Sequence, residues 1–156
     1  MVEWIFPSST PDPAPPQAVA DVVMQLERGE SELRLTQSSE GGLARKALRD
    51  VALRFLGGAA RGSAAGATFA PGELDFFLEA ARAAVSVQAG RALNNNGALV
   101  GVLAAASAPE VEWVVLVVPA VYKTSPAYAK LVAQAKDLFR AEGIGLDLRG
   151  AALVSY

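Results

Sequence analysis

The sequence contains no histidine and no cysteine. Without histidine there is no Ser-His-Asp triad, no imidazole general base and no histidine metal site. Without cysteine there is no disulfide, no thiolate nucleophile and no structural zinc of the usual kind. Any catalysis must therefore depend on carboxylates, lysine, tyrosine or serine, or on a hard cation held by oxygen ligands.

A long hydrophobic run is also missing. The longest one, from Trp113 to Val121, is interrupted by Pro119 and is far shorter than a bilayer requires. The first residues do not combine a basic start with an apolar stretch, so nothing there resembles a signal peptide. We therefore expect a soluble, cytoplasmic protein.

The chain carries no large excess of either charge. Its formal net charge is -2, whereas a nucleic-acid-binding protein is usually basic, although a local basic patch can suffice. Apolar residues make up 52% of the 156 residues and charged residues 19%, which is typical of a globular chain with a sizeable core. The length is that of one domain.

Proline and glycine divide the chain. Residues 1–16 are an N-terminal segment with a proline-rich connector, and residues 17–156 are predicted to form a single α/β domain. Hydrophobic periodicity and capping residues predict helices over 15–28, 42–56, 94–106 and 125–142. Strands are predicted over 31–36, 73–78, 84–88, 111–118, 146–148 and 151–156, with a loop over 57–72. Because strands alternate with helices and the tight hairpin must be antiparallel, we expect a three-layer fold with helices flanking a mixed β-sheet.

One predicted hairpin carries polar groups that can face a shared point. Asp75 lies among apolar residues of the first strand, and Ser86 and Gln88 lie on the second. Side chains at i and i+2 share a face of a strand, so Ser86 and Gln88 lie together, and in the right register Asp75 joins them. Since Asp is depleted in strands, a functional role for Asp75 is as good an interpretation as a solvent-facing position. Ser86 is interpreted as a satisfied hydroxyl at the edge of the core and not as a nucleophile, because no base is present to activate it. Gln88 alone is typical of a strand end.

This arrangement resembles the restriction-endonuclease-like PD-(D/E)xK superfamily, and within it the enzymes with an Asp…Glu-x-Gln motif. The matching residues are Asp75, Ser86 in place of the glutamate, and Gln88. The family core is a helix, a three-stranded meander, a helix and a strand. It corresponds to the predicted elements from 42–56 to 111–118, about half of the chain.

The resemblance implies a Mg²⁺-dependent endonuclease that acts on double-stranded DNA as a homodimer. The cation would lower the pKa of a bound water and stabilise charge on the phosphorus oxygens. Asp75 would be a metal ligand, and Gln88 would orient the water or the phosphate. Ser86 is neutral and a poor Mg²⁺ ligand, so the second carboxylate is missing and we expect weak or no cleavage.

Further basic and amide residues are candidates for DNA contacts. The resemblance implies that Arg91 contacts the DNA backbone. Asn94 is one of three consecutive asparagines that favour a helix cap, with a DNA contact as the alternative. Lys123 follows the strand over 111–118, at an edge where α/β sites often lie, although an exposed loop lysine is the favoured interpretation. A solvated helix face is favoured over phosphate contacts for four basic residues, Arg45, Lys46, Arg49 and Arg54.

Two other functions stay open. A non-enzymatic interaction or assembly domain is favoured by the acidic net charge, the missing carboxylate and the few basic residues. A hydrolase that uses carboxylates alone, through Glu73 together with Asp75 or Glu79, is supported only by their spacing on one face of the predicted strand.

Overall fold

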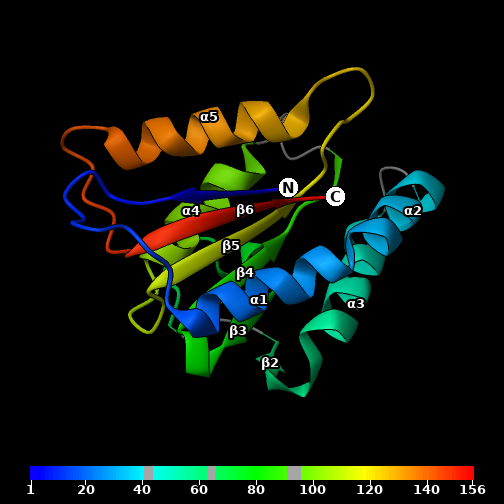
Figure 1. The fold of residues 1–156 in the computed structure, drawn as a ribbon, viewed down its shortest axis with the longest axis horizontal. Helices are drawn as coiled ribbons and strands as arrows, with labels where there is room; N and C mark the ends of the chain where they lie inside the picture. The colour runs from blue at the N-terminus through cyan, green and yellow to red at the C-terminus, as the bar shows by residue number, and fades with distance from the viewer. Residues whose placement is uncertain (41–43, 63–65, 91–95) are drawn as a thin grey trace.

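The computed structural model describes residues 1–40, 44–62, 66–90 and 96–156. A mixed β-sheet of six strands has helices on both faces (Figure 1). The strands are β1 (Val2–Ile5), β2 (Ala60–Arg61), β3 (Phe76–Leu78), β4 (Ala83–Val87), β5 (Trp113–Val118) and β6 (Gly150–Ser155). The α-helices are α1 (Gln17–Arg28), α2 (Glu30–Glu40), α3 (Arg45–Leu56), α4 (Gly97–Ala106) and α5 (Ala127–Arg140). The prediction of an α/β fold with a mixed sheet is thus confirmed.

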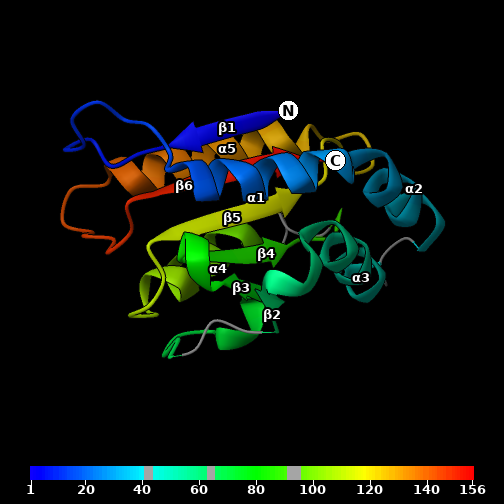
Figure 2. The ribbon, with the colours of Figure 1, turned by 60° about the horizontal axis from the view of Figure 1, so that its bottom comes forward.

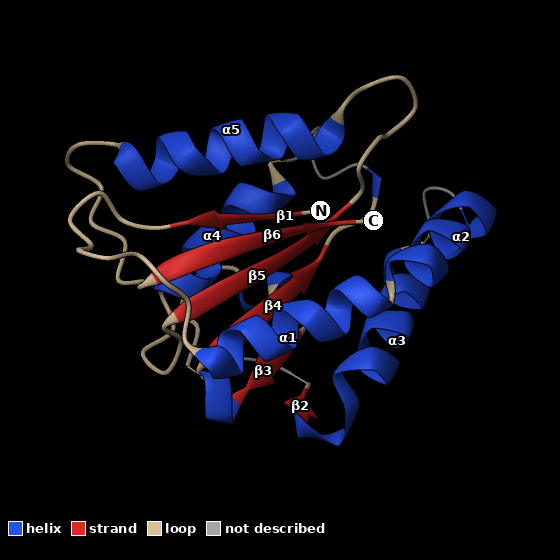
Figure 3. Cartoon of the chain, viewed as in Figure 1, coloured by secondary structure: helices blue, strands red, loops and turns tan. Residues whose placement is uncertain are grey.

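The strand order is β1-β6-β5-β4-β3-β2. Strands β4, β5 and β6 are parallel to one another, while β1 is antiparallel to β6. Strands β2, β3 and β4 form an antiparallel meander at the other side of the sheet. The parallel strands are joined through α4 and α5, as crossover connections require, so their carboxyl ends meet at one edge (Figure 3).

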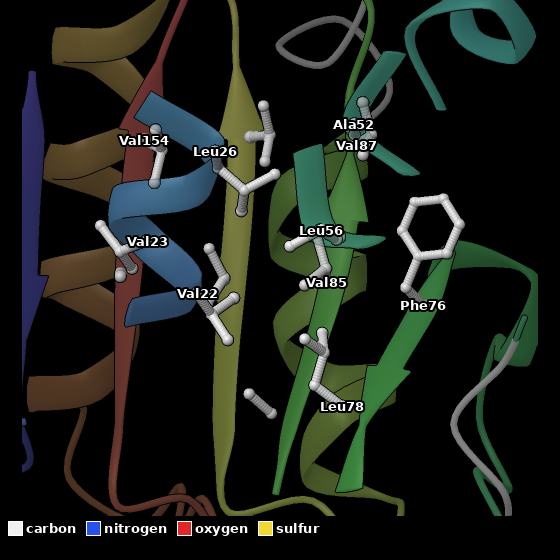
Figure 4. Packing of buried hydrophobic residues seen from close by; sticks show 14 of the residues in the cluster. Val22, Val23, Leu26, Ala52, Leu56, Phe76, Leu78, Val85, Val87 and Val154 are labelled. Atoms are coloured by element: carbon white, nitrogen blue, oxygen red, sulfur yellow. The ribbon is translucent and has the colours of Figure 1, made fainter. Parts of the chain in front are cut away.

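Each face of the sheet has its own hydrophobic core. On one face, α1 and α3 cover β4, β5 and β6, with Ala52 and Leu56 of α3 lying over Val87 and Val85 of β4 (Figure 4). On the other face, α4 and α5 pack on the alternate side chains of the same strands. Strand β5 is buried along its whole length, which explains its nearly continuous apolar sequence.

The strand predicted over 31–36 is wrong, because these residues lie in α2. The alternation of Leu33 and Leu35 suggested a strand, yet Leu33 is 1% exposed and Leu35 is 70% exposed. Residues two positions apart point to different sides of a helix, so only one of them reaches the core. The i,i+4 ion pair between Glu30 and Arg34 further stabilises the helical form.

Two further strand predictions need correction. Residues 146–148 form no strand; the alternation of Leu146 and Leu148 instead reflects a connecting segment that packs these two side chains onto the core beside α4 and α5. Within the segment predicted as a loop over 57–72, Ala60–Arg61 forms the edge strand β2 against β3.

The predicted hairpin is shorter than expected at its first strand. Glu73 ends a 3-10 helix, η3 (Pro71–Glu73), and Glu79 begins another, η4 (Glu79–Ala81). These two carboxylates therefore do not share a strand face with Asp75. The prediction that these carboxylates share one strand face is accordingly wrong.

The N-terminal segment contributes to the same sheet as the rest of the chain. Val2 to Ile5 pair with Val154 to Ala151 of β6, and the proline-rich connector then leads to α1. The predicted starts of the helices over 42–56 and 94–106 lie outside the described residues. In the ranges that the structure describes, no helix has the length and apolar character needed to cross a membrane.

Candidate functional site

Asp75 lies directly before β3 and is hydrogen-bonded to the end of β4. Its backbone N–H donates to the carbonyl of Val85 at 2.8 Å, and its Oδ2 accepts from the N–H of Val87 at 2.6 Å. The carboxylate thus takes the place of a backbone carbonyl in the β3-β4 ladder. Asp75 is only 2% exposed, so its charge is held away from bulk water.

Two arginines of α3 contact the other oxygen of this carboxylate. Arg49 Nε lies 2.8 Å from Asp75 Oδ1, and Arg45 Nη2 lies 3.6 Å from the same atom. They share a side of the helix because they are four residues apart. A buried carboxylate requires such partners, since an unpaired buried charge is very costly. Arg45 and Arg49 are therefore more than a solvated helix face, because both contact a buried carboxylate while they still reach solvent.

The ionisation of Asp75 is governed mainly by its burial. Burial raises the pKa of this carboxyl above the ordinary value of 3.8. The Val87 N–H and the guanidiniums of Arg45 and Arg49 act in the opposite direction, because they favour the charged form. Nearby Glu73 adds to the increase by repulsion.

Ser86 and Gln88 lie together, as strand alternation predicts. Gln88 Nε2 donates to Ser86 Oγ at 2.6 Å, and both side chains are buried. Helix α4 packs directly over this pair, because a Cβ added to Gly101 would lie 3.2 Å from Ser86 Oγ. The serine hydroxyl is therefore satisfied inside the core and has no open side for a ligand.

Tyr156, directly after β6, is hydrogen-bonded to the backbone of Gln88. Tyr156 Oη donates to the backbone carbonyl of Gln88 at 2.6 Å, and the side chain is 3% exposed. A Cβ added to Gly90 would lie 2.0 Å from the ring of Tyr122, so only glycine fits there. These tyrosine contacts join the ends of β4, β5 and β6, and the local sequence gave no sign of them.

The predicted three-residue cluster does not form around one point. Among the described residues, no hydrogen bond or ion pair joins Asp75 to Ser86 or Gln88. The Asp75 carboxylate is directed to α3, whereas Ser86 faces α4 on the opposite face of the sheet.

The candidate DNA contacts are only partly described. Lys123 is exposed in a tight turn between Tyr122 and Ser125, with its Nζ 5.6 Å from the centroid of the Tyr122 ring. Arg91 and Asn94 lie outside the described residues.

The residues present do not fit a Mg²⁺ site. Both oxygens of Asp75 already have partners, and Ser86 supplies a neutral hydroxyl that is hydrogen-bonded to Gln88. In the described part of the chain, no group of three acidic residues is placed to hold a metal ion. Mg²⁺ prefers carboxylates and a nearly ideal octahedral shell, which this arrangement does not offer.

Comparison with known proteins gives no match to a family model, to a curated protein or to a solved structure.

Proposed function

We propose that the protein is a restriction-endonuclease-like domain that binds double-stranded DNA without cleaving it. The observation that carries this proposal is the order of α3, β2, β3, β4, α4 and β5. In this order an antiparallel meander is followed by a helix and a strand parallel to β4. This order is compatible with the family core that the sequence resemblance implies, and the hydrogen bond between Asp75 and the end of β4 adds support to the proposal.

Loss of cleavage follows from the contacts of the matching residues. Hydrolysis of a phosphodiester at a site of this kind needs a cation to activate water and to stabilise the developing charge. Ser86 brings no charge to such an ion, and the Asp75 carboxylate is neutralised by guanidinium groups instead. A homodimer and a cytoplasmic location stay predictions.

The direct test measures binding and cleavage by the same preparation. We expect the unmodified protein to bind a short DNA duplex with an affinity that falls steeply with salt, because phosphate contacts release counterions. We also expect a supercoiled plasmid to stay intact in Mg²⁺. Absent binding, or binding with a flat salt response, would overturn the proposal, as would plasmid nicking.

A carboxylate at position 86 tests whether cleavage is lost through Ser86 alone. Because Ser86 faces α4 while the Asp75 carboxylate is directed to α3, such a carboxylate does not complete a metal site with Asp75, and we expect Ser86→Glu to give no plasmid nicking in Mg²⁺. Because α4 lies against Ser86, the smaller Ser86→Asp is made in parallel, and circular dichroism identifies the folded variants. Nicking by a folded variant with either carboxylate, abolished when Asp75→Ala is added, would contradict this expectation.

A non-enzymatic interaction domain is the second candidate, favoured by a groove between α1, α3 and η4. The groove has a volume of about 550 Å³, and Val22, Leu56 and Leu78 contribute to its apolar lining. A groove of this size can hold side chains of a partner. Salt-independent or absent DNA binding would favour this candidate.

A further inference from the structure

We propose that Arg45 and Arg49 form a phosphate-binding pair, held in place by Asp75, that takes over the role of a divalent cation. The inference deepens the proposed function, because its ligand would be a backbone phosphate of double-stranded DNA. In a cleaving site the cation connects a protein carboxylate to a substrate phosphate. Here a guanidinium already contacts the carboxylate and carries further donors for the phosphate.

The orientation of both guanidiniums is fixed from several sides. Arg49 approaches Asp75 through Nε, and its Cζ lies 5.9 Å from the centroid of the Phe76 ring. Arg45 Nη2 lies 3.4 Å from the carbonyl oxygen of Gly72 and 3.5 Å from Glu73 Oε2. Groups that are ordered before a ligand arrives lose less conformational entropy when they bind it.

Both arginines also reach solvent. The side chain of Arg45 is 36% exposed and that of Arg49 is 42% exposed, whereas Asp75 is 2% exposed. Each guanidinium has five N–H donors in a planar fork that matches the geometry of a phosphate. Since Asp75 takes only part of this capacity, donors of both arginines are left for a ligand outside the protein.

The basic residues of α3 differ in their partners. Arg45 and Arg49 contact Asp75 and Glu73, Lys46 forms no ion pair among the described residues, and Asp50 adds an exposed carboxylate to the same helix. Arg54, at the other end of α3, instead pairs with Glu32 of α2. Arg54 is therefore a matched control on the same helix.

The position of the pair agrees with the proposed function. Helix α3 lies across the end of β4, with Ala52 over Val87 (Figure 4), and Arg49 lies one turn nearer the start of the helix. Figure 2 shows α3 beside β4. Arg49 contacts Asp75, whose carboxylate accepts a hydrogen bond from Val87 at the end of β4, so the pair lies near the carboxyl end of that strand. A guanidinium binds a phosphate without activating water, so this site would bind DNA and leave it intact.

The test compares Arg45→Gln and Arg49→Gln with Arg54→Gln in duplex binding over a range of salt. The logarithm of the binding constant falls linearly with the logarithm of the salt concentration, and each lost phosphate contact should make this slope less steep by about 0.9. We expect this decrease for Arg45→Gln and Arg49→Gln, no decrease for Arg54→Gln, and unchanged binding in EDTA. Equal effects of all three changes in folded proteins would overturn the proposal. If Arg49→Gln does not fold, Arg49→Lys retains the charge and should still weaken binding because the planar fork is lost.

A second comparison tests the positioning role of Asp75. Asp75→Asn and Glu73→Gln each remove one negative charge near the arginines, so charge alone predicts tighter DNA binding for both. If Asp75 positions the pair, Asp75→Asn should instead weaken binding, while Glu73→Gln strengthens it. Tighter binding by a folded Asp75→Asn variant would overturn the positioning role.

Titration with a small phosphate compound tests the phosphate site on its own, without relying on the proposed binding of duplex DNA. Inorganic pyrophosphate is titrated into the whole protein while the side-chain Nε–H signals of its arginines are followed by NMR. Saturable shifts at Arg45 and Arg49, absent at Arg54, would support the phosphate site even if the protein binds no duplex. Absence of these shifts would overturn the site, whatever the DNA result.

Discussion

Asp75 is an ionisable residue whose side chain is buried. Its carboxylate has the Val87 N–H on one oxygen and the guanidiniums of Arg45 and Arg49 on the other. Removing one partner of a buried ion pair leaves an uncompensated charge, and such changes cost about 3–5 kcal/mol in well-buried cases. The arginines here are partly exposed, so the loss of either one should cost less than this.

The pH dependence of stability should report the ionisation of Asp75. Burial raises the pKa of its carboxyl above 3.8, so the native state holds this proton to a higher pH than the unfolded state does. The contribution of Asp75 to the free energy of unfolding is therefore largest at low pH and falls as the pH rises from 3.8 towards the native pKa. Asp75→Asn lacks this titration. In urea denaturation, the free energy of unfolding of the natural protein minus that of Asp75→Asn should thus decrease with rising pH. An increase over this range would contradict the raised pKa.

Helix α2 shows how one pattern can fit two kinds of element. Leu33 and Leu35 alternate with charged residues as in a half-buried strand, but only Leu33 packs into the core with α1 and α3. Gly29 is the one residue between α1 and α2, and its N–H bonds back to the carbonyl of Leu26. The chain therefore turns into a second helix without entering the sheet.

Truncation of the two leucines distinguishes the helix from the strand. Leu33→Ala should destabilise the protein by about 2–5 kcal/mol, because it leaves a cavity at a fully buried position. Leu35→Ala should change stability by less than about 0.5 kcal/mol, because the side chain is exposed. Chemical denaturation of both variants measures the difference. Similar losses at the two positions would contradict the helical assignment.

At the scale of the whole molecule, stability is concentrated in the middle of the sheet. Strand β5 pairs with β4 and β6 in parallel and is buried from both faces. The outermost strands, β1 and β2, each pair on one side only, and β2 consists of two residues. Local opening should therefore begin at β2.

Native-state hydrogen exchange tests this gradient. The amides of Val114 to Val118 should exchange only through global unfolding, so their protection should equal the full free energy of unfolding. The amides of Ala60 and Arg61 should exchange much faster through local opening. Equal protection of β2 and β5 would contradict this distribution of stability.

The sequence alone was sufficient for the features that depend on local periodicity. The apolar stripe of α1 and the continuous apolar run of β5 each identify their element, because burial acts on residues that are close in the chain. The α/β class follows from the alternation of these elements. The sequence alone also excluded histidine- and cysteine-based catalysis, because the chain contains neither residue.

Only the tertiary structure determined which residues form ion pairs with the Asp75 carboxylate. Its partners Arg45 and Arg49 come from a helix about 30 residues earlier in the chain, and neither periodicity nor spacing indicates that they meet the carboxylate. The clue in the sequence was a single Asp among apolar residues, since a buried charge must be paired. Which of the nearby cations would pair with it depended on how α3 packs against β4. Because of this packing, the carboxylate that the sequence suggested as a metal ligand instead forms ion pairs with two arginines.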